Sequence, residues 1–260
     1  MNNRYAVITG GSSGLGFELA KLFAADGYDL LIGGVSDRVF EAVEQLEHYG
    51  TTVVGVKADL STEEGVATFL AKANEKGRPI DDAVLNAGIS LGGGFLDIPL
   101  DKQLSLLNLN VTSLVKIAYN VIPGMVEKGS GRVLLMSSLS ATTPTPYESI
   151  YGPTKAFISS FGHGLREELI GTGVQITLFH PGATATTFHA RAGMNSNIFS
   201  DNSWKNDPAL VAQQGYQGLL RGQTSVVGSD AATHRAWNDN HILPEEEKAR
   251  RFAEASRPSN

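Results

Sequence analysis

The stretch Thr9-Gly10-Gly11-Ser12-Ser13-Gly14-Leu15-Gly16 decides the fold that we expect for this chain. It follows a short apolar run at residues 5–8 and opens a segment of helical periodicity at residues 15–25. Glycines in such a turn let the backbone approach a pyrophosphate closely, and the following helix offers free N–H groups and a positive dipole end. The stretch therefore predicts a strand, a dinucleotide-binding turn and a helix, although a tight turn of small residues without a ligand has the same composition.

Short apolar runs and longer helical segments continue to alternate after this turn. The predicted strands are residues 5–8, 29–32, 52–56, 83–85, 133–136 and 174–179, and the predicted helices are 15–25, 37–49, 62–75, 101–127 and 149–170. Gly27 and Gly50 stand where helices end, and Ser61 with Glu64 forms a capping box for the third helix. The alternation predicts βαβ units on one parallel sheet, which is an α/β, doubly wound fold of the Rossmann type.

The chain reads as a single domain over residues 1–260, because no linker or low-complexity stretch interrupts it before about residue 190. Towards the C-terminus, Asp207 and Pro208 would cap and begin a helix that runs to about Arg221. Residues 225–227 would form a final edge strand, and residues 244–255 a charged surface helix.

Composition excludes several classes of protein. The 260 residues are 42% hydrophobic and 18% charged, as in ordinary globular proteins. No apolar run approaches the roughly 18 residues needed to cross a bilayer, and the first strand starts too early to leave room for a signal peptide, so we expect a cytoplasmic protein. The chain has no cysteine and no HExxH pair, so no metal site is expected, and its net charge of −6 argues against a nucleic-acid partner.

Tyr151 and Lys155 have the YxxxK spacing, which places the phenol and the ammonium on one face of a helix. A free phenol has a pKa of about 10, so it needs a fixed positive charge nearby to exchange a proton near neutral pH. Pro153 fits this helix only if the helix starts just before Tyr151. Ser138 stands at the predicted C-terminal end of a strand, where active sites of open α/β sheets gather. A lone YxxxK is also common as an ordinary surface pair, and Tyr147 has no lysine four residues later.

Taken together, these features resemble the short-chain dehydrogenase/reductase family. The matching pieces are the TGxxxGxG form of the turn, Asp59-Leu60 after the third strand, Asn86-Ala87-Gly88 after the fourth, Pro181-Gly182 after the sixth, and the YxxxK pair, all in the family's order. The resemblance covers roughly residues 4–190. It implies an NAD(P)-dependent oxidoreductase in which hydride passes between the nicotinamide and a carbonyl or alcohol carbon.

The resemblance also implies roles for individual residues. Tyr151 would exchange the proton of the substrate oxygen, and Ser138 would hydrogen-bond that oxygen. Lys155 would stabilise the phenolate, and Asn110 would hold a water beside the lysine. The residues implied in cofactor binding are Gly10, Ser12, Ser13, Gly14, Leu15, Gly16, Arg38, Asp59, Leu60, Asn86, Ala87, Gly88, Tyr151, Lys155, Pro181, Gly182, Thr184 and Thr186. Taken singly, Asp59 is as readily a turn residue and Asn110 a helix residue with a local hydrogen bond.

The end of the second predicted strand bears on the choice of cofactor. Family members often carry there an aspartate for the ribose of NAD or an arginine for the phosphate of NADP, whereas this chain has Gly34 and Val35. No carboxylate at the strand end would repel a 2′-phosphate, and Asp37 fits better in the first turn of the next helix. Donors to such a phosphate are available from Ser12, Ser13, Ser36 and Arg38. We therefore favour NADP(H), with NAD(H) as the alternative.

Two segments are expected to enclose the substrate. Residues 186–206 correspond to the family's mobile lid and contain the apolar side chains Phe188, Met194, Ile198, Phe199 and Trp204, while residues 90–95 would form an opposite wall of little bulk. Nearby, Arg191 and His189 have no partner spaced to clamp a carboxylate or phosphate. The sequence thus favours a carbonyl reductase for a neutral, largely hydrophobic ketone or alcohol, although each apolar side chain is as compatible with simple core packing. Residues 229–260 would be a C-terminal extension.

Gly162 and Gly164 stand inside the helix predicted for residues 149–170, where each costs about 1 kcal/mol relative to alanine. Close approach of a second copy of this helix would offset the cost, as is common in the family, so we expect a homodimer or homotetramer. Contact within the subunit is the alternative. Two other functions stay open: an epimerase or dehydratase with a retained cofactor, and a nucleotide-sensing protein without turnover. Relatives of the first class are usually longer, and those of the second typically lack the tyrosine or the lysine.

Overall fold

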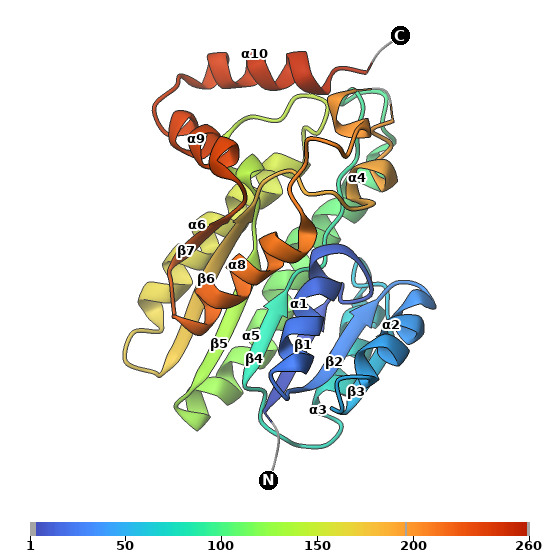
Figure 1. Ribbon diagram of the computed structural model, residues 1–260, viewed down its shortest axis with the longest axis vertical. Coiled ribbons are helices and arrows are strands. Elements are labelled where there is room, and N and C mark those ends of the chain that lie inside the picture. Colours follow the sequence, from blue (N-terminus) through green and yellow to red (C-terminus); the bar gives the residue numbers. More distant parts are fainter. Residues whose placement is uncertain (1–3, 196, 259–260) are drawn as a thin grey trace.

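A computed structural model describes residues 4–195 and 197–258 of the chain. Within these residues, seven parallel strands form one sheet in the order β3-β2-β1-β4-β5-β6-β7 (Figure 1). The strands are β1 Tyr5–Thr9, β2 Asp29–Gly34, β3 Val53–Lys57, β4 Asp82–Leu85, β5 Gly131–Met136, β6 Val174–Pro181 and β7 Ser225–Gly228. The predicted α/β doubly wound fold is confirmed. The strand order reverses between β1 and β4, and ligands of such sheets bind beside the carboxyl ends of the strands at this reversal.

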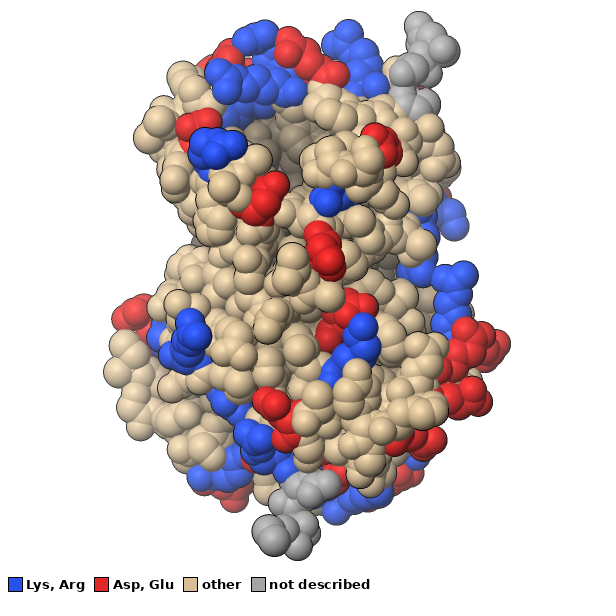
Figure 2. All heavy atoms as spheres, viewed as in Figure 1, with Lys and Arg blue, Asp and Glu red and all other residues tan. Residues whose placement is uncertain are grey.

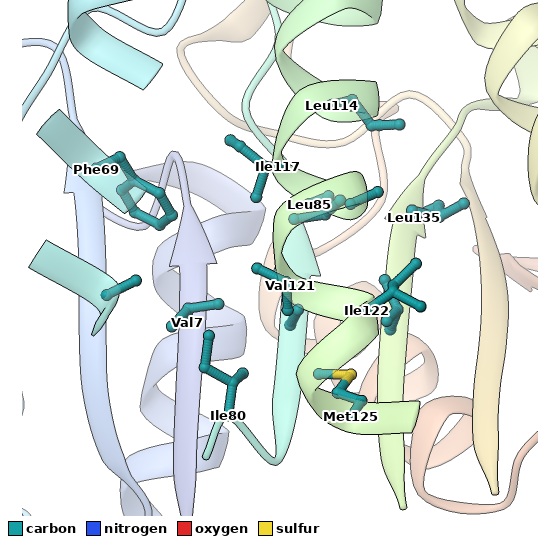
Figure 3. Packing of buried hydrophobic residues seen from close by; sticks show 14 of the residues in the cluster. Val7, Phe69, Ile80, Leu85, Leu114, Ile117, Val121, Ile122, Met125 and Leu135 are labelled. Atoms are coloured by element: carbon teal, nitrogen blue, oxygen red, sulfur yellow. The ribbon is translucent and has the colours of Figure 1, made fainter. Parts of the chain in front are cut away.

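Helices cover both faces of the sheet (Figure 1). One face carries α1 Gly14–Ala25, α2 Arg38–Glu47 and α8 Pro208–Leu220, and the other carries α3 Glu63–Asn74, α5 Ser113–Lys128 and α6 Tyr151–Glu168. Each face has its own cluster of buried apolar side chains. Figure 3 shows the cluster on the face that carries α3, α5 and α6. Here Leu114, Ile117 and Val121 of α5 pack on strand residues that include Val7, Leu85 and Leu135. With both faces filled by apolar contacts, the polar groups of a site are left to the loops at the strand ends.

The helix predicted for residues 101–127 is interrupted. It consists of α4 Leu100–Leu107, a π-helical turn Asn108–Thr112, and then α5. A π-turn inserts one extra residue into a helix and is frequent at functional sites. No glycine or proline marks the interruption, which is why hydrophobic periodicity alone did not reveal it. Asn110 lies in the middle of this turn.

The capping box predicted from Ser61 and Glu64 is wrong by one residue. The N-cap of α3 is Thr62, whose hydroxyl accepts a hydrogen bond from the N–H of Gly65 (3.0 Å). The hydroxyl of Ser61 instead donates to Oδ1 of Asp59 (2.7 Å). A charged acceptor two residues away outcompetes the backbone for the Ser61 side chain.

The two glycines inside α6 have different surroundings. A Cβ at Gly162 would lie 2.5 Å from Leu178 Cδ2 and 2.9 Å from Leu135 Cδ1, so Gly162 allows α6 to lie close to its own sheet. A Cβ at Gly164 would meet no atom within 4 Å. A contact within the subunit therefore accounts for Gly162, and this residue carries no argument for an oligomer.

The C-terminal segment lies above the carboxyl ends of the strands (Figure 1). The predictions of α8, of the edge strand β7 and of a last helix, α10 Glu245–Ser256, are confirmed, whereas α9 Ala231–Asn240 was not predicted. The buried ammonium of Lys248 donates to the carbonyl oxygen of Thr142 (3.1 Å), and the hydroxyl of Ser256 donates to that of Pro146 (2.8 Å). These bonds hold α10 over the segment that leads into α6. None of the helices in the described part of the chain is both long and apolar enough to cross a membrane.

Candidate active site

The turn between β1 and α1 brings the main chain into very close contact with itself. A Cβ at Gly16 would lie 2.2 Å from the carbonyl oxygen of Gly10, closer than any side chain tolerates. Gly10 and Gly14 have φ angles of +66° and +57°, in the left-handed region that glycine adopts without strain. The shape of the turn therefore requires glycine at all three positions.

The neighbouring strand β4 holds this turn in place. Asn86 follows β4 and donates its side-chain amide to the carbonyl oxygens of Thr9 (2.9 Å) and Gly10 (3.1 Å). In return, the hydroxyl of Thr9 accepts the N–H groups of Asn86 (2.9 Å) and Ala87 (3.0 Å). Asn86 and Ala87 thus order the turn through their own contacts with it.

The N-terminus of α1, at Gly14 and Leu15, has an uncompensated positive end. Ser13 is the N-cap residue, but its side chain accepts no N–H group of the helix, and the first turn contains no acidic residue. Free N–H groups and the helix dipole together attract an anion. The glycine turn and this free helix end fit the pyrophosphate of a dinucleotide cofactor.

Two arginines lie beside the same helix end. Arg191, the last residue of α7 Phe188–Arg191, donates a guanidinium N–H to the hydroxyl of Ser13 (3.3 Å). Partial burial and the nearby charge of Arg38, the first residue of α2, lower the pKa of Arg191 below its ordinary value. No carboxylate among residues 4–195 and 197–258 forms an ion pair with either guanidinium. Asp37, the neighbour of Arg38 in the chain, pairs with Lys57 instead (2.9 Å). Arg191 therefore faces the glycine turn and does not serve as an anchor deep in the substrate cleft.

Two further residues predicted to contact the cofactor have structural partners. Ser12 stands over the end of β2, because a Cβ at Gly34 would lie 2.8 Å from its Oγ. Asp59 accepts both the N–H (2.9 Å) and the hydroxyl (2.7 Å) of Ser61, so its carboxylate orders the turn after β3. Leu60, next to it, is buried.

The chain after β6 returns to the glycine turn. Gly182 follows Pro181, the last residue of β6, and its carbonyl oxygen accepts the hydroxyl of Thr184 (2.9 Å). The hydroxyl of Thr186 accepts the N–H of Phe188 (3.2 Å). A Cβ at Gly14 would lie 3.6 Å from Cγ2 of Thr186. The segment after β6 and the turn after β1 therefore border the same space.

Tyr151 and Lys155 lie one helical turn apart at the start of α6, with only 8% and 3% of their surfaces exposed. Nζ of Lys155 lies 5.6 Å from the centroid of the Tyr151 ring and donates to the carbonyl oxygen of Met136 (2.8 Å) at the end of β5. Burial lowers the pKa of Lys155 to about 8. The predicted helix start is confirmed, since Pro153 falls in the first turn, where its missing N–H costs nothing.

Ser138 connects the end of β5 to Tyr151. Its hydroxyl accepts the N–H of Ser140 (3.1 Å) in a short 3-10 turn. Burial raises the pKa of Tyr151 most, the charge of Glu148 raises it further, and the nearby hydroxyl of Ser138 lowers it. The phenol is therefore protonated near neutral pH and is placed to donate a proton to an oxygen beside Ser138.

Asn110 joins the π-helical turn to the loop after β4 and to α6. Its Oδ1 accepts the N–H of Ile89 (2.9 Å), and its Nδ2 donates to the carbonyl oxygen of Ile89 (2.9 Å) and to the hydroxyl of Thr154 (3.1 Å). A Cβ at Gly88 would lie 3.2 Å from Oδ1 of Asn110 and 3.4 Å from Nζ of Lys155, so the three residues are neighbours. The geometry brings Asn110 to the lysine, as expected from the sequence.

The two expected walls of the substrate cleft touch each other. The N–H of Gly92 donates to the carbonyl oxygen of Ala192 (2.7 Å), and Met194 is buried against Gly92. Of the apolar side chains in segment 186–206, Phe188 reaches the site, with its ring centroid 5.4 Å from that of Tyr151. Phe199 lies 6.0 Å from Phe252 of α10 and so belongs to the packing of the C-terminal helix.

The face of the molecule shown in Figure 2 is hollowed just below α10. In Figure 1 this hollow falls between α9 and the segment around α7. Charged residues of both signs are scattered over this face and also border the hollow. His189 stacks on Phe199 (4.9 Å between centroids), and burial with the charge of Lys205 lowers its pKa to about 4. A neutral imidazole offers no charge to an acidic substrate at pH 7.

Sequence reasoning missed one ionisable residue of the site, Glu148. Its carboxyl accepts the hydroxyl of Ser90 (2.5 Å), and burial raises its pKa to about 7. Its carbonyl oxygen accepts the N–H of Tyr151 (2.9 Å). The sequence alone does not single out Glu148, because a glutamate in the loop before a helix is usually solvated.

Comparison with known proteins gives matches over most of the chain. Residues 4–197 match the family model described as short chain dehydrogenase. A serine 3-dehydrogenase from Rhizobium radiobacter is 34% identical over 208 residues, covering 79% of this chain and 82% of that protein. An uncharacterised oxidoreductase from Bacillus subtilis is 32% identical over 244 residues, covering 90% of this chain and 92% of that protein.

Solved structures agree with these matches. A short-chain dehydrogenase from Sphingobium yanoikuyae, in complex with NADPH, superposes with a TM-score of 0.82 at 28% identity. The superposition covers 92% of this chain and 93% of that chain. The similarity thus extends beyond the motifs to the C-terminal part of the fold.

Replacing Asn110 by alanine should destabilise the protein, because alanine leaves the N–H and the carbonyl of Ile89 without their partners. Net losses of about 1 kcal/mol per hydrogen bond predict a fall of about 2 kcal/mol in the free energy of unfolding, measured by urea denaturation. Asn120→Ala, at an exposed position of α5, is the matched control and should change it by less than about 0.5 kcal/mol. Equal effects of the two substitutions would show that the Asn110 bonds do not stabilise the site.

Proposed function

Because this chain belongs to the short-chain dehydrogenase/reductase family of NAD(P)-dependent oxidoreductases acting on CH–OH groups, we propose that it is a carbonyl reductase for largely hydrophobic ketones. The observation that supports this most is the meeting of two sets of groups at one edge of the sheet. Tyr151, Ser138 and Lys155 lie at the ends of β5 and α6, and the anion-binding turn lies at the end of β1. The turn could hold a redox cofactor, and Tyr151 supplies a buried proton donor at the same edge of the sheet.

A nicotinamide cofactor held at this site would supply or accept the hydride of the proposed reaction. Tyr151 donates its proton to the carbonyl oxygen as the C=O double bond becomes a single bond, and takes the proton back in the reverse direction. Ser138 holds that oxygen beside the phenol and stabilises the charge that develops on it. The net change is ketone, NAD(P)H and one proton to alcohol and NAD(P)+.

Lys155 and Asn110 support Tyr151 in this proposal. The ammonium of Lys155 stabilises the phenolate left after proton transfer, and the carbonyl of Met136 fixes its position (2.8 Å). Because burial lowers the pKa of Lys155 to about 8, this amine also exchanges protons readily near neutral pH. Asn110 orients Ile89 and Thr154 around it and would hold a water that returns a proton to the lysine.

The cofactor is proposed to be held by the residues that border the turn. Gly10, Gly14, Leu15 and Gly16 would receive the pyrophosphate, with Ser12 and Ser13 beside it. Asp59, Leu60 and the run Asn86-Ala87-Gly88 would line the adenosine and ribose, and Pro181, Gly182, Thr184 and Thr186 the nicotinamide. We favour NADP(H), because Arg191 contacts Ser13, the charge of Arg38 is close enough to act on Arg191, and no described carboxylate forms an ion pair with either guanidinium.

The proposal of a hydrophobic substrate is supported by what lines the cleft. Phe188 packs on Tyr151, Arg191 is directed to Ser13, and His189 is neutral at pH 7. The relative named for serine acts on an amino acid, whose carboxylate would need a basic partner. No described arginine or histidine is placed to serve it, so a substrate without a carboxylate fits better.

We further propose that residues 186–206 act as the lid of a single NAD(P)-binding domain spanning residues 1–260, with residues 229–260 as an extension above the site. The bonds from Gly92 to Ala192 and from Asn197 Nδ2 to the carbonyl of Ser256 (2.9 Å) support this, because they tie the segment to both neighbours of the cleft.

Tyr151→Phe should keep the fold and the affinity for NADPH while reducing turnover of an aryl ketone by 10²–10⁴-fold, the usual contribution of general acid catalysis. The measurement is NADPH oxidation in absorbance, with cofactor affinity followed by fluorescence. Turnover within about tenfold of the wild type would show that another group donates the proton.

NADPH should bind at least about tenfold more tightly than NADH, since a charged hydrogen bond to a 2′-phosphate adds this much or more. Arg38→Gln should remove most of that difference in affinity by weakening the binding of NADPH alone. Fluorescence titration measures the dissociation constants of both cofactors. Arg235→Gln, at an exposed arginine of α9, is the control. Tighter binding of NADH by the wild type would refute the preference.

The protein should form a homodimer or homotetramer through α4, α5 and α6. These helices expose apolar side chains, among them Tyr119 (80% exposed) and Phe157 (42%), and Phe157 stacks on Phe161. Light scattering at micromolar concentration should give at least twice the chain mass of 27.6 kDa. A single species of the monomer mass would reject the proposal.

A further inference from the structure

Glu148 is a buried acid beside the proposed proton donor, and neither the catalytic nor the cofactor groups use it. Only 3% of its surface is exposed. Oε1 accepts the hydroxyl of Ser90 (2.5 Å), and no arginine, lysine or histidine of the described residues forms an ion pair with the carboxylate. Enclosing a carboxylate without a positive partner is costly, so its presence requires an explanation.

The second carboxyl oxygen of Glu148, Oε2, has no hydrogen-bond donor among residues 4–195 and 197–258. The side-chain polar atoms of the described residues that are both fully buried and without a hydrogen-bond partner belong to Thr51, His180 and His189. Oε2 of Glu148 is not among them, although it has no described partner. Oε2 therefore keeps an opening to solvent. Glu148 stands three residues before Tyr151, and its partner Ser90 belongs to the expected wall of the substrate cleft at residues 90–95, so the carboxyl lies between the start of α6 and that wall.

The chain places Glu148 there with some strain. Tyr147 has a φ of +64°, which is uncommon for a residue with a side chain. Its carbonyl oxygen accepts the N–H of Gly93 (2.9 Å), and its hydroxyl accepts Nε of Arg257 (3.0 Å). The loop after β4 and the C-terminal segment thus both hold Tyr147, and backbone strain of this kind is frequent at ligand sites.

We infer that Glu148 recognises a protonated amine on the substrate, so that the ketone is an amino ketone with an otherwise hydrophobic body. An ammonium at Oε2 would give the carboxylate the partner that the protein does not supply. It would also offset the negative charge that opposes formation of the Tyr151 phenolate. The inference rests on the proposed reductase activity. It replaces the expectation of a neutral substrate, which was based only on the basic residues near the cleft.

The test compares two ketones of the same shape, 5-(dimethylamino)pentan-2-one and 6-methylheptan-2-one, which differ by a protonated nitrogen in place of CH. The wild type with NADPH should favour the amine by about tenfold to a hundredfold in kcat/KM at pH 7, the range expected for one charged hydrogen bond. Glu148→Gln keeps the side-chain shape and an acceptor for Ser90, and should bring the ratio to about one. The amine should lose efficiency, and the branched ketone should be reduced at least as fast as by the wild type.

Two further variants separate charge from structure. Glu168→Gln, at the exposed far end of α6, should keep the wild-type ratio. Ser90→Ala removes the hydrogen bond that lowers the pKa of Glu148, so it should leave more of the carboxyl protonated at pH 7 and reduce the preference for the amine, which should return at about pH 8.5. If Glu148→Gln fails to fold, Ser90→Ala still decides the matter, because a preference that is lost at pH 7 and does not return at the higher pH would mean that the Ser90–Glu148 bond and not the charge is responsible.

Binding of the corresponding alcohols to the protein loaded with NADP+, measured by calorimetry, gives a readout that does not depend on turnover. Tighter binding of the amino alcohol without turnover of either ketone would support the role of Glu148 and refute the reductase. Equal turnover and equal binding of the two members of each pair would refute the role of Glu148 and leave the reductase in place.

Discussion

The close packing of the turn after β1 against the end of β4 is the constraint on which the rest of the site depends. Gly16 leaves no room for a Cβ beside the carbonyl of Gly10, and Asn86 binds the carbonyls of Thr9 and Gly10 from the neighbouring strand. These contacts join the two halves of the sheet at the point where the strand order reverses. They fix the direction of α1, and with it the free N–H groups that would face an anion.

A second constraint acts at the start of α6. The helix must begin at Tyr151 because Pro153 is tolerated in the first turn only, and this places Lys155 under the carbonyl of Met136. Burial then acts on both groups in opposite senses, raising the pKa of the phenol and lowering that of the ammonium. The difference between the two pKa values therefore widens. A positively charged group of a ligand beside the phenol or Glu148 would favour the phenolate and lower the pKa of Tyr151.

Sequence patterns predicted the strands, their parallel arrangement and most helices, because alternation of apolar runs and glycine stops are local properties. The YxxxK spacing also placed Tyr151 beside Lys155, and Ser138 was expected at the end of a strand, where active sites of such sheets gather. The position of Asn110 beside the lysine was implied only by the resemblance to the family. The features that the patterns missed depend on which groups meet in the folded chain and compete for the same hydrogen-bond partner. The hydroxyl of Ser61 was taken by Asp59, so that Thr62 became the cap.

The π-helical turn at Asn108–Thr112 carries no sequence mark, and Gly162 was explained by side chains of β5 and β6 that are distant in sequence. Glu148 is the most instructive omission. A glutamate in a loop is usually solvated, and only the contacts with Ser90 and Tyr151 make it part of the site.

The central claim is that the chain transfers hydride between a nicotinamide and a substrate carbon with net turnover. Incubation of the wild type with an aryl ketone and NADPH deuterated on the transferred face of C4, followed by mass spectrometry of the alcohol, tests this most directly. The account predicts an alcohol that carries one deuterium on the carbinol carbon, and no carbon-bound deuterium when unlabelled NADPH is used in heavy water. An alcohol without the label, or no alcohol from a protein that binds NADPH, would contradict it.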